Sequence, residues 1–104
     1  MIIVVGEMRY EAGEIERLGP ALAALVEASR GLPGCLHYSL SVDVTDPDLL
    51  IISHRWEDEE AMAGYYISPA LAAYGREIDD DKVVAMSARA YSADYLRTML
   101  AKEG

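Results

Sequence analysis

His54 and Trp56 are the side chains of this sequence whose types and spacing point most directly to chemistry. They stand two residues apart in an apolar stretch, and alternate side chains of a strand share one face, so the imidazole and the indole lie side by side. An imidazole titrates near neutral pH and can accept a proton, and an indole can stack on an aromatic ring. We therefore predict His54 as a catalytic base and Trp56 as a catalytic residue that holds a ring.

Tyrosine and methionine side chains are predicted to surround this pair. Tyr65, on the helix that follows, is the third predicted catalytic residue, because its hydroxyl can hydrogen-bond a substrate oxygen. The predicted substrate-binding residues are Tyr38, Met62, Tyr66 and Tyr74. A pocket walled by aromatic and thioether groups with a few polar tips suits a flat, hydrophobic phenolic ligand.

Each of these residues also has a plain structural interpretation. Tyrosine and methionine at helical spacing are typical of a packed core, and this alternative stays open for Met62, Tyr66 and Tyr74. His54 lies on an otherwise apolar face, where an imidazole must either hydrogen-bond within the core or face a cavity. Cys35 is expected to pack in the core, because no basic residue stands beside it in the sequence to activate its thiol.

Four strands and two interrupted helices are expected to position these side chains. Apolar patterns predict strands at residues 2–10, 36–43, 49–56 and 83–91. Helical spacing predicts a helix from Ile15 to Ser29 that is interrupted at Gly19-Pro20, and a second helix that begins after Asp58 and breaks at Ser68-Pro69. The order β-α-β-β-α-β predicts an α+β, ferredoxin-like fold, in which a four-stranded antiparallel sheet carries two helices on one face.

The chain is expected to form one domain over residues 1–91, with residues 92–104 as a helical extension of it. Ser92 is a suitable helix cap, and apolar residues follow at helical spacing. These apolar residues are Tyr95, Leu96, Met99 and Leu100. The extension could cover the pocket, bind a partner subunit or shield an edge strand, and the sequence leaves these alternatives open.

Composition excludes several classes of function. The 104 residues include 9 basic and 18 acidic side chains, a net charge of −9, and 52% are hydrophobic. The acidic balance and the scattered basic residues oppose binding to nucleic acid or to anionic membranes. A single cysteine, an amino terminus without a basic leader region, and apolar runs too short to span a bilayer predict a cytoplasmic protein.

The sheet face opposite the helices is expected to be apolar. Ile3, Val5 and one side of the strand at residues 83–91 would meet water there, as a larger patch than a monomer usually exposes. This pattern predicts a homodimer that buries the face. The alternative is that the carboxy-terminal helix covers the same face within one chain.

Three segments resemble the signature regions of the antibiotic biosynthesis monooxygenase (ABM) domain family. They are Leu25 to Arg30, Pro33 to Tyr38, and Arg55 to Met62 followed by Ser68-Pro69. The resemblance extends to about Tyr91 and implies a dimeric α/β-barrel built from ferredoxin-like sheets. It also implies one of the family's activities, which include cofactor-independent oxidation of quinols, anthrones and polyketide phenols and the degradation of haem.

Two departures from the family pattern affect the expected chemistry. His54 stands where many members carry glutamate, and Tyr65 stands where they commonly carry histidine on the second helix. Haem-degrading members resemble one another in an asparagine, a tryptophan and an iron-binding histidine, whose positions fall near Gly6, Trp56 and Gly75 here. The missing histidine removes the main anchor for haem, so haem degradation is the least favoured activity.

The leading hypothesis is therefore a monooxygenase that uses O2 and a small aromatic substrate without a cofactor. Neither the acidic run Glu57 to Glu60 nor Asp79 to Asp81 has the ligand spacing of a calcium loop, no glycine-rich nucleotide motif is present, and no metal is expected. The alternative is a non-catalytic, dimeric domain that binds a small molecule or whose cavity is filled by its own side chains.

Overall fold

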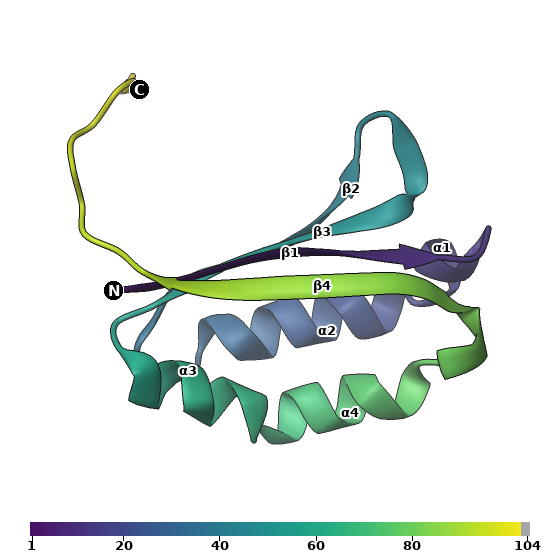
Figure 1. Ribbon diagram of the computed structural model, residues 1–104. Helices are drawn as coiled ribbons and strands as arrows, with labels where there is room; N and C mark the ends of the chain where they lie inside the picture. The colour runs from purple at the N-terminus through teal and green to yellow at the C-terminus, as the bar shows by residue number, and fades with distance from the viewer. Residues whose placement is uncertain (103–104) are drawn as a thin grey trace.

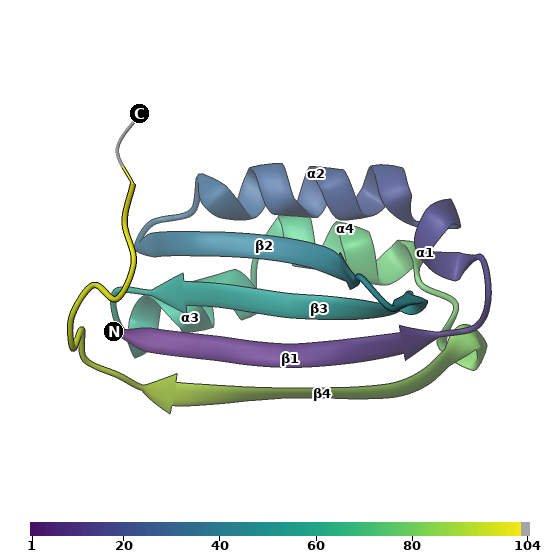
Figure 2. The same cartoon turned by 90° about the horizontal axis from the view of Figure 1, so that it is seen from above.

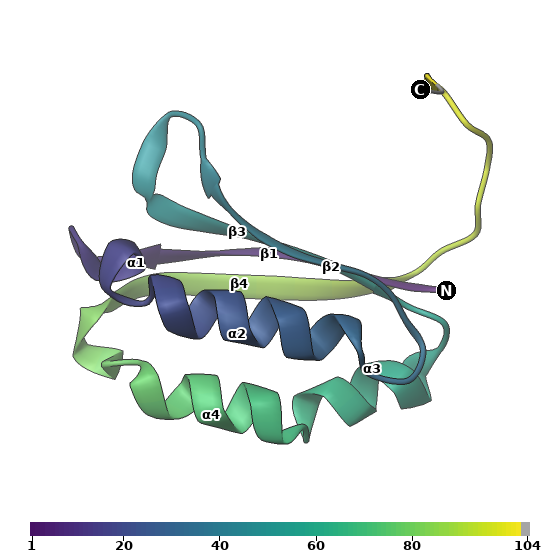
Figure 3. The same cartoon turned by 180° about the vertical axis from the view of Figure 1, so that it is seen from behind.

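A single four-stranded antiparallel sheet forms the framework of the molecule, and its helices lie on one side of it (Figures 1 and 3). The structure is a computed structural model, and it describes residues 1–102. The strand order is β2-β3-β1-β4. The elements in chain order are β1 (Ile2–Tyr10), α1 (Glu14–Arg17), α2 (Gly19–Arg30), β2 (Cys35–Asp43), β3 (Asp46–Trp56), α3 (Glu59–Tyr66), α4 (Pro69–Glu77), the 3-10 helix η1 (Asp80–Lys82) and β4 (Val83–Ser92). The predicted α+β, ferredoxin-like arrangement is confirmed.

Local sequence signals account for both helix interruptions. Leu18 separates α1 from α2, and Pro20 lies in the first turn of α2, where its missing amide hydrogen costs no hydrogen bond. The side chain of Asp58 accepts a hydrogen bond from the Ala61 amide at 2.8 Å and begins α3. Ser68 caps α4 in the same way, with Pro69 as its first residue. The predicted breaks at both prolines are confirmed.

The register of the strands decides which side chains face the helices. Tyr38 on β2, His54 on β3, Val4 on β1 and Ala90 on β4 form one transverse row of paired residues. Paired residues of antiparallel strands point to the same face. Tyr38, His54 and Val4 are at most 2% exposed, so this row lies on the face that the helices cover.

The helix-covered face holds the hydrophobic core. Helices α2 and α4 cover it, and Figure 2 shows both helices toward the β2 side of the sheet, with β4 at the opposite edge. The buried apolar side chains are Ile2, Val4, Tyr10, Ile15, Leu18, Leu22, Leu25, Tyr38, Leu50, Trp56, Tyr65 and Tyr74. The edge strand contributes little to this core, because every residue of β4 after Val83 is exposed.

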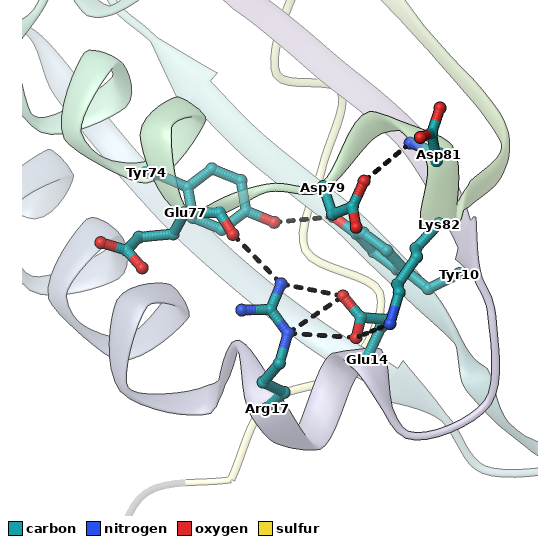
Figure 4. Close-up of polar contacts among 8 residues, drawn as sticks. All are labelled: Tyr10, Glu14, Arg17, Tyr74, Glu77, Asp79, Asp81 and Lys82. Atoms are coloured by element: carbon teal, nitrogen blue, oxygen red, sulfur yellow. Dashed lines mark hydrogen bonds and ion pairs between the residues drawn. The ribbon is translucent and has the colours of Figure 1, made fainter.

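A polar network ties α1 to the end of α4 (Figure 4). Glu14 is only 5% exposed, and its carboxylate accepts hydrogen bonds from Arg17 Nε at 3.0 and 3.1 Å and from Arg17 Nη2 at 2.8 Å. Lys82 Nζ lies 3.7 Å from the same carboxylate, and Arg17 Nη2 also donates to the Glu77 carbonyl at 3.1 Å. The buried charge is therefore paired, as its removal from water requires.

The predicted carboxy-terminal helix is wrong for the residues that the structure describes. Residues 93–102 form no helix, and Ser92 ends β4 instead of capping a new element. An isolated helix of this length is marginal in water unless a packing surface buries its apolar stripe, and Tyr95, Leu96, Met99 and Leu100 are all exposed. The last two residues of the predicted extension, 103–104, lie outside the described residues. No helix within residues 1–102 is long and apolar enough to cross a membrane.

Candidate functional site

Strand β3 brings the two leading candidate residues to the helix-covered face. His54 and Trp56 are 1% and 0% exposed, and α3 lies over the end of β3 that carries them. Tyr38 stacks on His54, with ring centroids 5.0 Å apart and an angle of 17° between the ring planes. The predicted placement of imidazole, indole and Tyr38 on one face is therefore confirmed, while their roles remain predictions.

The indole of Trp56 hydrogen-bonds the imidazole of His54. Trp56 Nε1 lies 2.6 Å from His54 Nδ1. An indole N–H can only donate, so Nδ1 must be the accepting, unprotonated nitrogen of the ring. The neutral imidazole then carries its proton on Nε2. Among residues 1–102, no protein group accepts a hydrogen bond from Nε2.

The protonation equilibrium of His54 favours this neutral form. Burial, and to a lesser extent the charge of His37, lowers the pKa of His54 from 6.5 to about 4. At neutral pH the ring is therefore uncharged, with its lone pair directed to Trp56 and its N–H available at Nε2. In this arrangement the imidazole is a hydrogen-bond donor, since the lone pair that a base would need is already occupied.

Tyr65 on α3 joins the cluster through its hydroxyl. Tyr65 and Tyr38 hydroxyl oxygens lie 2.6 Å apart, and both side chains are buried. Burial raises the pKa of both phenols, and the hydrogen bond raises the pKa of Tyr65 further while it lowers that of Tyr38. Either hydroxyl can donate this hydrogen bond. Both phenols are neutral at physiological pH.

Tyr66 forms the outer edge of the same cluster, and we call these five side chains the aromatic cluster: Tyr38, His54, Trp56, Tyr65 and Tyr66. The Tyr66 ring lies 4.9 Å from Tyr65 and 6.4 Å from His54, between ring centroids. It is 50% exposed, whereas the other four members are at most 5% exposed. Tyr66 is therefore the member that can move without disturbing the core. Met62 packs against the core near them and is partly buried.

Tyr74 does not join the aromatic cluster. Its hydroxyl lies 2.7 Å from that of Tyr10, at the far end of β1 beside the Glu14 network (Figure 4). Val4 pairs with His54, so Tyr10 stands six residues further along β1, which is roughly 20 Å at the rise of a strand. The sequence pattern placed Tyr74 on the apolar side of its helix correctly, but it could not show which part of the sheet lies beneath α4.

Tyr10 and Ser29 are polar residues of the core that the sequence interpretation did not single out as functional. Tyr10 is 2% exposed and pairs with Tyr74, which its position at the end of an apolar strand could have suggested. Ser29 on α2 is fully buried, and its hydroxyl has no partner within residues 1–102. An unpaired buried hydroxyl lowers the free energy of unfolding. In the sequence, Ser29 is marked only by its position in the helical stripe.

A surface of small residues continues the His54 row toward the edge of the sheet. On the helix-facing side, Val4 pairs with Ala90 and Gly6 pairs with Ala88, and both alanines are exposed. A side chain at Gly6 would collide with β4, because its Cβ would lie 2.7 Å from Ala88 Cα. We call Gly6, Ala88 and Ala90 the small-residue strip; in the strand register Val4 lies between it and His54.

Cavities elsewhere in the chain are lined by other residues. A groove of about 580 Å³ lies beside α3 and is lined by Leu32, Pro33, Gly34, Glu57, Asp58, Glu60, Ala61, Ala63, Gly64 and Ile67. No residue of the aromatic cluster lines this groove. Within residues 1–102, no three histidine, cysteine, aspartate or glutamate side chains lie close enough together to hold a metal ion.

Comparison with known proteins places this chain in a family. The family model for antibiotic biosynthesis monooxygenase matches residues 1–77, which include every member of the aromatic cluster. The chain belongs to the ABM family. No curated protein sequence matches it.

Solved structures that resemble the chain agree with ABM membership at the level of fold. A protein from Deinococcus radiodurans named as an antibiotic biosynthesis monooxygenase is 24% identical, with a TM-score of 0.86, and the match covers 97% of this chain and 100% of that one. A similarly named protein from Nitrosomonas europaea is 14% identical, with a TM-score of 0.84 and coverages of 91% and 100%. The protein Rv0793 from Mycobacterium tuberculosis is 15% identical, with a TM-score of 0.80 and coverages of 93% and 98%. At these identities the likeness shows the fold.

Proposed function

We propose that this ABM-family protein is a cofactor-independent monooxygenase that oxidises a quinol-, anthrone- or polyketide-type phenol with O2. The observation that carries the proposal is the hydrogen bond from Trp56 to His54, which leaves a neutral imidazole with its proton on Nε2 inside an aromatic cluster. Such a group stabilises a developing oxyanion without itself carrying a charge. An electron-rich aromatic substrate supplies that oxyanion when its phenolic or enolic proton leaves.

The small-residue strip in the His54 row is the proposed seat of the substrate ring. Ala88 and Ala90 carry only methyl groups there and are exposed, and Tyr66, 6.4 Å from His54 between ring centroids, is a half-exposed ring that can turn aside. A flat ligand on this strip would reach His54 with one oxygen and stack its face against Tyr66. Tyr38, Trp56 and Tyr65 would hold the imidazole in place from behind, and Met62 would line the same side.

The proposed reaction needs only the substrate and dioxygen. The substrate loses a proton to water, and its anion, held by the N–H of His54, gives one electron to O2. The resulting organic radical and superoxide combine into a peroxide, which loses water and leaves a carbonyl group in a quinone product. One oxygen atom enters the product and the other leaves as water, so the electrons balance without a further reductant. His54 therefore acts as a donor in this scheme, in place of the base expected from the sequence.

Oxygen uptake tests the proposal. The protein would be mixed with a panel of quinols and anthrones without added cofactor, and uptake would be corrected for autoxidation. His54→Asn keeps an acceptor for Trp56 but moves the donor. We expect a loss of uptake of about a hundredfold or more, in the range found when one oxyanion donor is removed. Tyr10→Phe, at the far end of the sheet, is the matched control and should retain the wild-type rate. Equal rates for wild type and His54→Asn would reject the assigned site.

A second candidate function is a binding domain without turnover. The tight packing of the cluster favours it, since His54, Trp56, Tyr38 and Tyr65 leave at most 5% of their surfaces open. Thermal unfolding separates the two candidates, because a ligand that binds only the native state raises the melting temperature. Stabilisation by the aromatic panel without oxygen uptake would support a binding domain.

A further inference from the structure

We propose that the aromatic cluster is also a route for single electrons, along which Tyr66 at the surface refills an oxidised Trp56 in the core across the ring of Tyr65. The route is a property of the folded chain, whereas its use during turnover rests on the proposed function. The starting observation is that Trp56 is the only tryptophan of the chain and is fully buried, yet rings in contact join it to the surface.

Three aromatic rings form the path from Trp56 to the surface. The ring centroids of Trp56 and Tyr65 lie 5.4 Å apart with 30° between the ring planes, so the two rings stack. Tyr65 meets Tyr66 edge to face, with centroids 4.9 Å apart. Both arrangements are favoured geometries of aromatic pairs. Tyr66 is 50% exposed, so the path ends at a side chain that soluble reductants can reach.

The hydrogen bond between Trp56 and His54 provides a place for the proton of an oxidised indole. Loss of one electron turns the indole N–H into a strong acid, and the His54 Nδ1 lone pair lies 2.6 Å from Nε1. The proton therefore moves to Nδ1 and leaves a neutral indolyl radical beside an imidazolium. Burial lowers the pKa of His54 to about 4, but it disfavours a charged indole as well as a charged imidazole, so it does not oppose this transfer.

Tyr38 and Tyr65 touch the same rings but offer no lasting place for the radical. A phenol that loses an electron must also lose its proton, and these two hydroxyls are bonded to each other at 2.6 Å. Burial raises the pKa of both phenols, and neither side chain is more than 5% exposed, so water does not receive the proton. Tyr65 is therefore a bridge between Trp56 and Tyr66.

Tyr66 is the member of the cluster that can release both an electron and a proton. One electron passes from its ring across Tyr65 to Trp56, His54 returns the proton to the indole, and the phenolic proton of Tyr66 leaves to water. Trp56 and His54 are then restored, and a neutral tyrosyl radical remains at the surface. A soluble thiol or ascorbate reduces this radical with one electron and one proton.

An oxygenase that works through radicals has a use for such a route. Homolytic cleavage of the peroxide leaves oxygen-centred radicals beside His54. Each radical that takes one electron from Trp56 and one proton from water becomes an alcohol or water, so the oxidant is quenched before it attacks the core. The oxidised site moves to Tyr66, where a soluble reductant repairs it.

Transient absorption after photoionisation of the indole tests the route without substrate. Since the chain has one tryptophan, light at the long-wavelength edge of indole absorption ejects an electron from Trp56 alone. In wild type we expect the indolyl radical to decay while a tyrosyl radical rises at the same rate. Tyr66→Phe should lose this rise, because phenylalanine keeps the ring but has no phenol to oxidise.

Tyr91→Phe is the matched control. Tyr91 is also 50% exposed. It pairs with Ile3, whereas Trp56 pairs with Ile2, so Tyr91 points to the opposite face of the sheet. This variant should give the same decay and the same rise as wild type. Both changes keep an aromatic ring at a half-exposed position, so both variants should keep the fold.

His54→Asn tests the proton step separately. An amide oxygen accepts the hydrogen bond of Trp56 but is too weak a base to take its proton, so the indolyl radical should stay in its cationic form, which absorbs at a longer wavelength than the neutral radical. A neutral radical in this variant would overturn His54 as the proton acceptor.

Two results would overturn the route itself. One is an equal tyrosyl signal in wild type and Tyr66→Phe, and the other is a wild-type indolyl radical that decays with no tyrosyl signal. Oxygen uptake is read in a separate experiment, so a protein that proves inactive as an oxygenase still gives a decisive result here.

Discussion

Trp56 donates its indole N–H to Nδ1 of His54 at 2.6 Å, with the two rings nearly perpendicular at 77°. Both residues lie on one face of β3, two positions apart, and both are buried. This bond fixes the tautomer of the imidazole, because the indole can only donate. It therefore decides which kind of chemistry His54 can perform, and it determines the predictions for both side chains.

Replacement of the indole should destabilise the protein through the acceptor that it leaves behind. For Trp56→Phe we expect the free energy of unfolding to fall by roughly 2–4 kcal/mol, from the unpaired Nδ1 and from the smaller ring. Adding His54→Leu to this variant removes the unpaired nitrogen, so the double variant should lose less than the sum of the single changes. Urea unfolding at neutral pH measures the free energy of unfolding of the two single variants and of the double variant. Additive losses would contradict a direct bond between the two side chains.

Stability should fall in mild acid because His54 resists protonation in the folded state. Its pKa is lowered from 6.5 to about 4, so between these values the unfolded chain binds a proton that the native chain does not. The contribution of neutral His54 to the free energy of unfolding is thus fully present above pH 6.5 and is lost as the pH falls toward 4. The loss is about 2 kcal/mol between pH 7 and pH 5. Comparison of the urea midpoints of wild type and His54→Asn isolates this effect. An identical pH dependence in the two proteins would contradict it.

Two glycines should respond to alanine in opposite directions. At Gly6 the new Cβ would lie 2.8 Å from the Cβ of Ala88 and would also meet the Ser87 carbonyl oxygen, so β4 must shift. We expect Gly6→Ala to lower the free energy of unfolding by about 1–3 kcal/mol. At Gly75 in α4 nothing lies within 4 Å of the new atom, and Gly75→Ala should raise it by about 0.5–1 kcal/mol. Thermal unfolding of both variants checks the pair, and a neutral Gly6→Ala would contradict the close approach of β1 and β4.

Glu14 should support the fold as a carboxylate. The hydrogen bond from Arg17 is the main cause that lowers its pKa, and Lys82 adds to it. A lowered carboxyl pKa contributes stability that is present above the unfolded value of 4.5 and is lost as the pH falls. Glu14→Gln should therefore lower the urea midpoint at pH 7, and its difference from wild type should shrink in acid. Glu16→Gln, an exposed position on the same helix, is the matched control and should leave the midpoint unchanged.

Much of the framework was predictable because its signals are local. The alternation in β2 and β3 placed Tyr38, His54 and Trp56 on one face, and the strand register confirms this. Proline and capping residues predicted the interrupted helices, since each effect acts within one helical turn. The largest shift of a strand bound is at the hairpin, where β3 begins at Asp46, three residues before the predicted strand.

The parts that could not be predicted depend on contacts between distant segments. The helical stripe of residues 95–100 predicted a helix, but such a stripe forms one only where another surface buries it. The partner of Tyr74 depends on where α4 crosses the sheet, which no local pattern specifies. The bond between His54 and Trp56 depends on two side-chain rotamers within a packed face. Alternation gave the proximity of the two rings, and only the structure gives the direction of the hydrogen bond.

The role of the His54–Trp56 pair is tested most directly by the fate of isotopically heavy dioxygen during turnover of a quinol or anthrone substrate by the cofactor-free protein. We expect the wild-type protein to form, faster than autoxidation, a quinone that carries one heavy oxygen atom at the oxidised carbon. His54→Asn should lose this rate and Tyr10→Phe should keep it. Mass spectrometry of the product reads the result. A product without heavy oxygen, or equal incorporation rates in wild type and His54→Asn, would contradict the claim that the His54–Trp56 site performs the oxygen chemistry.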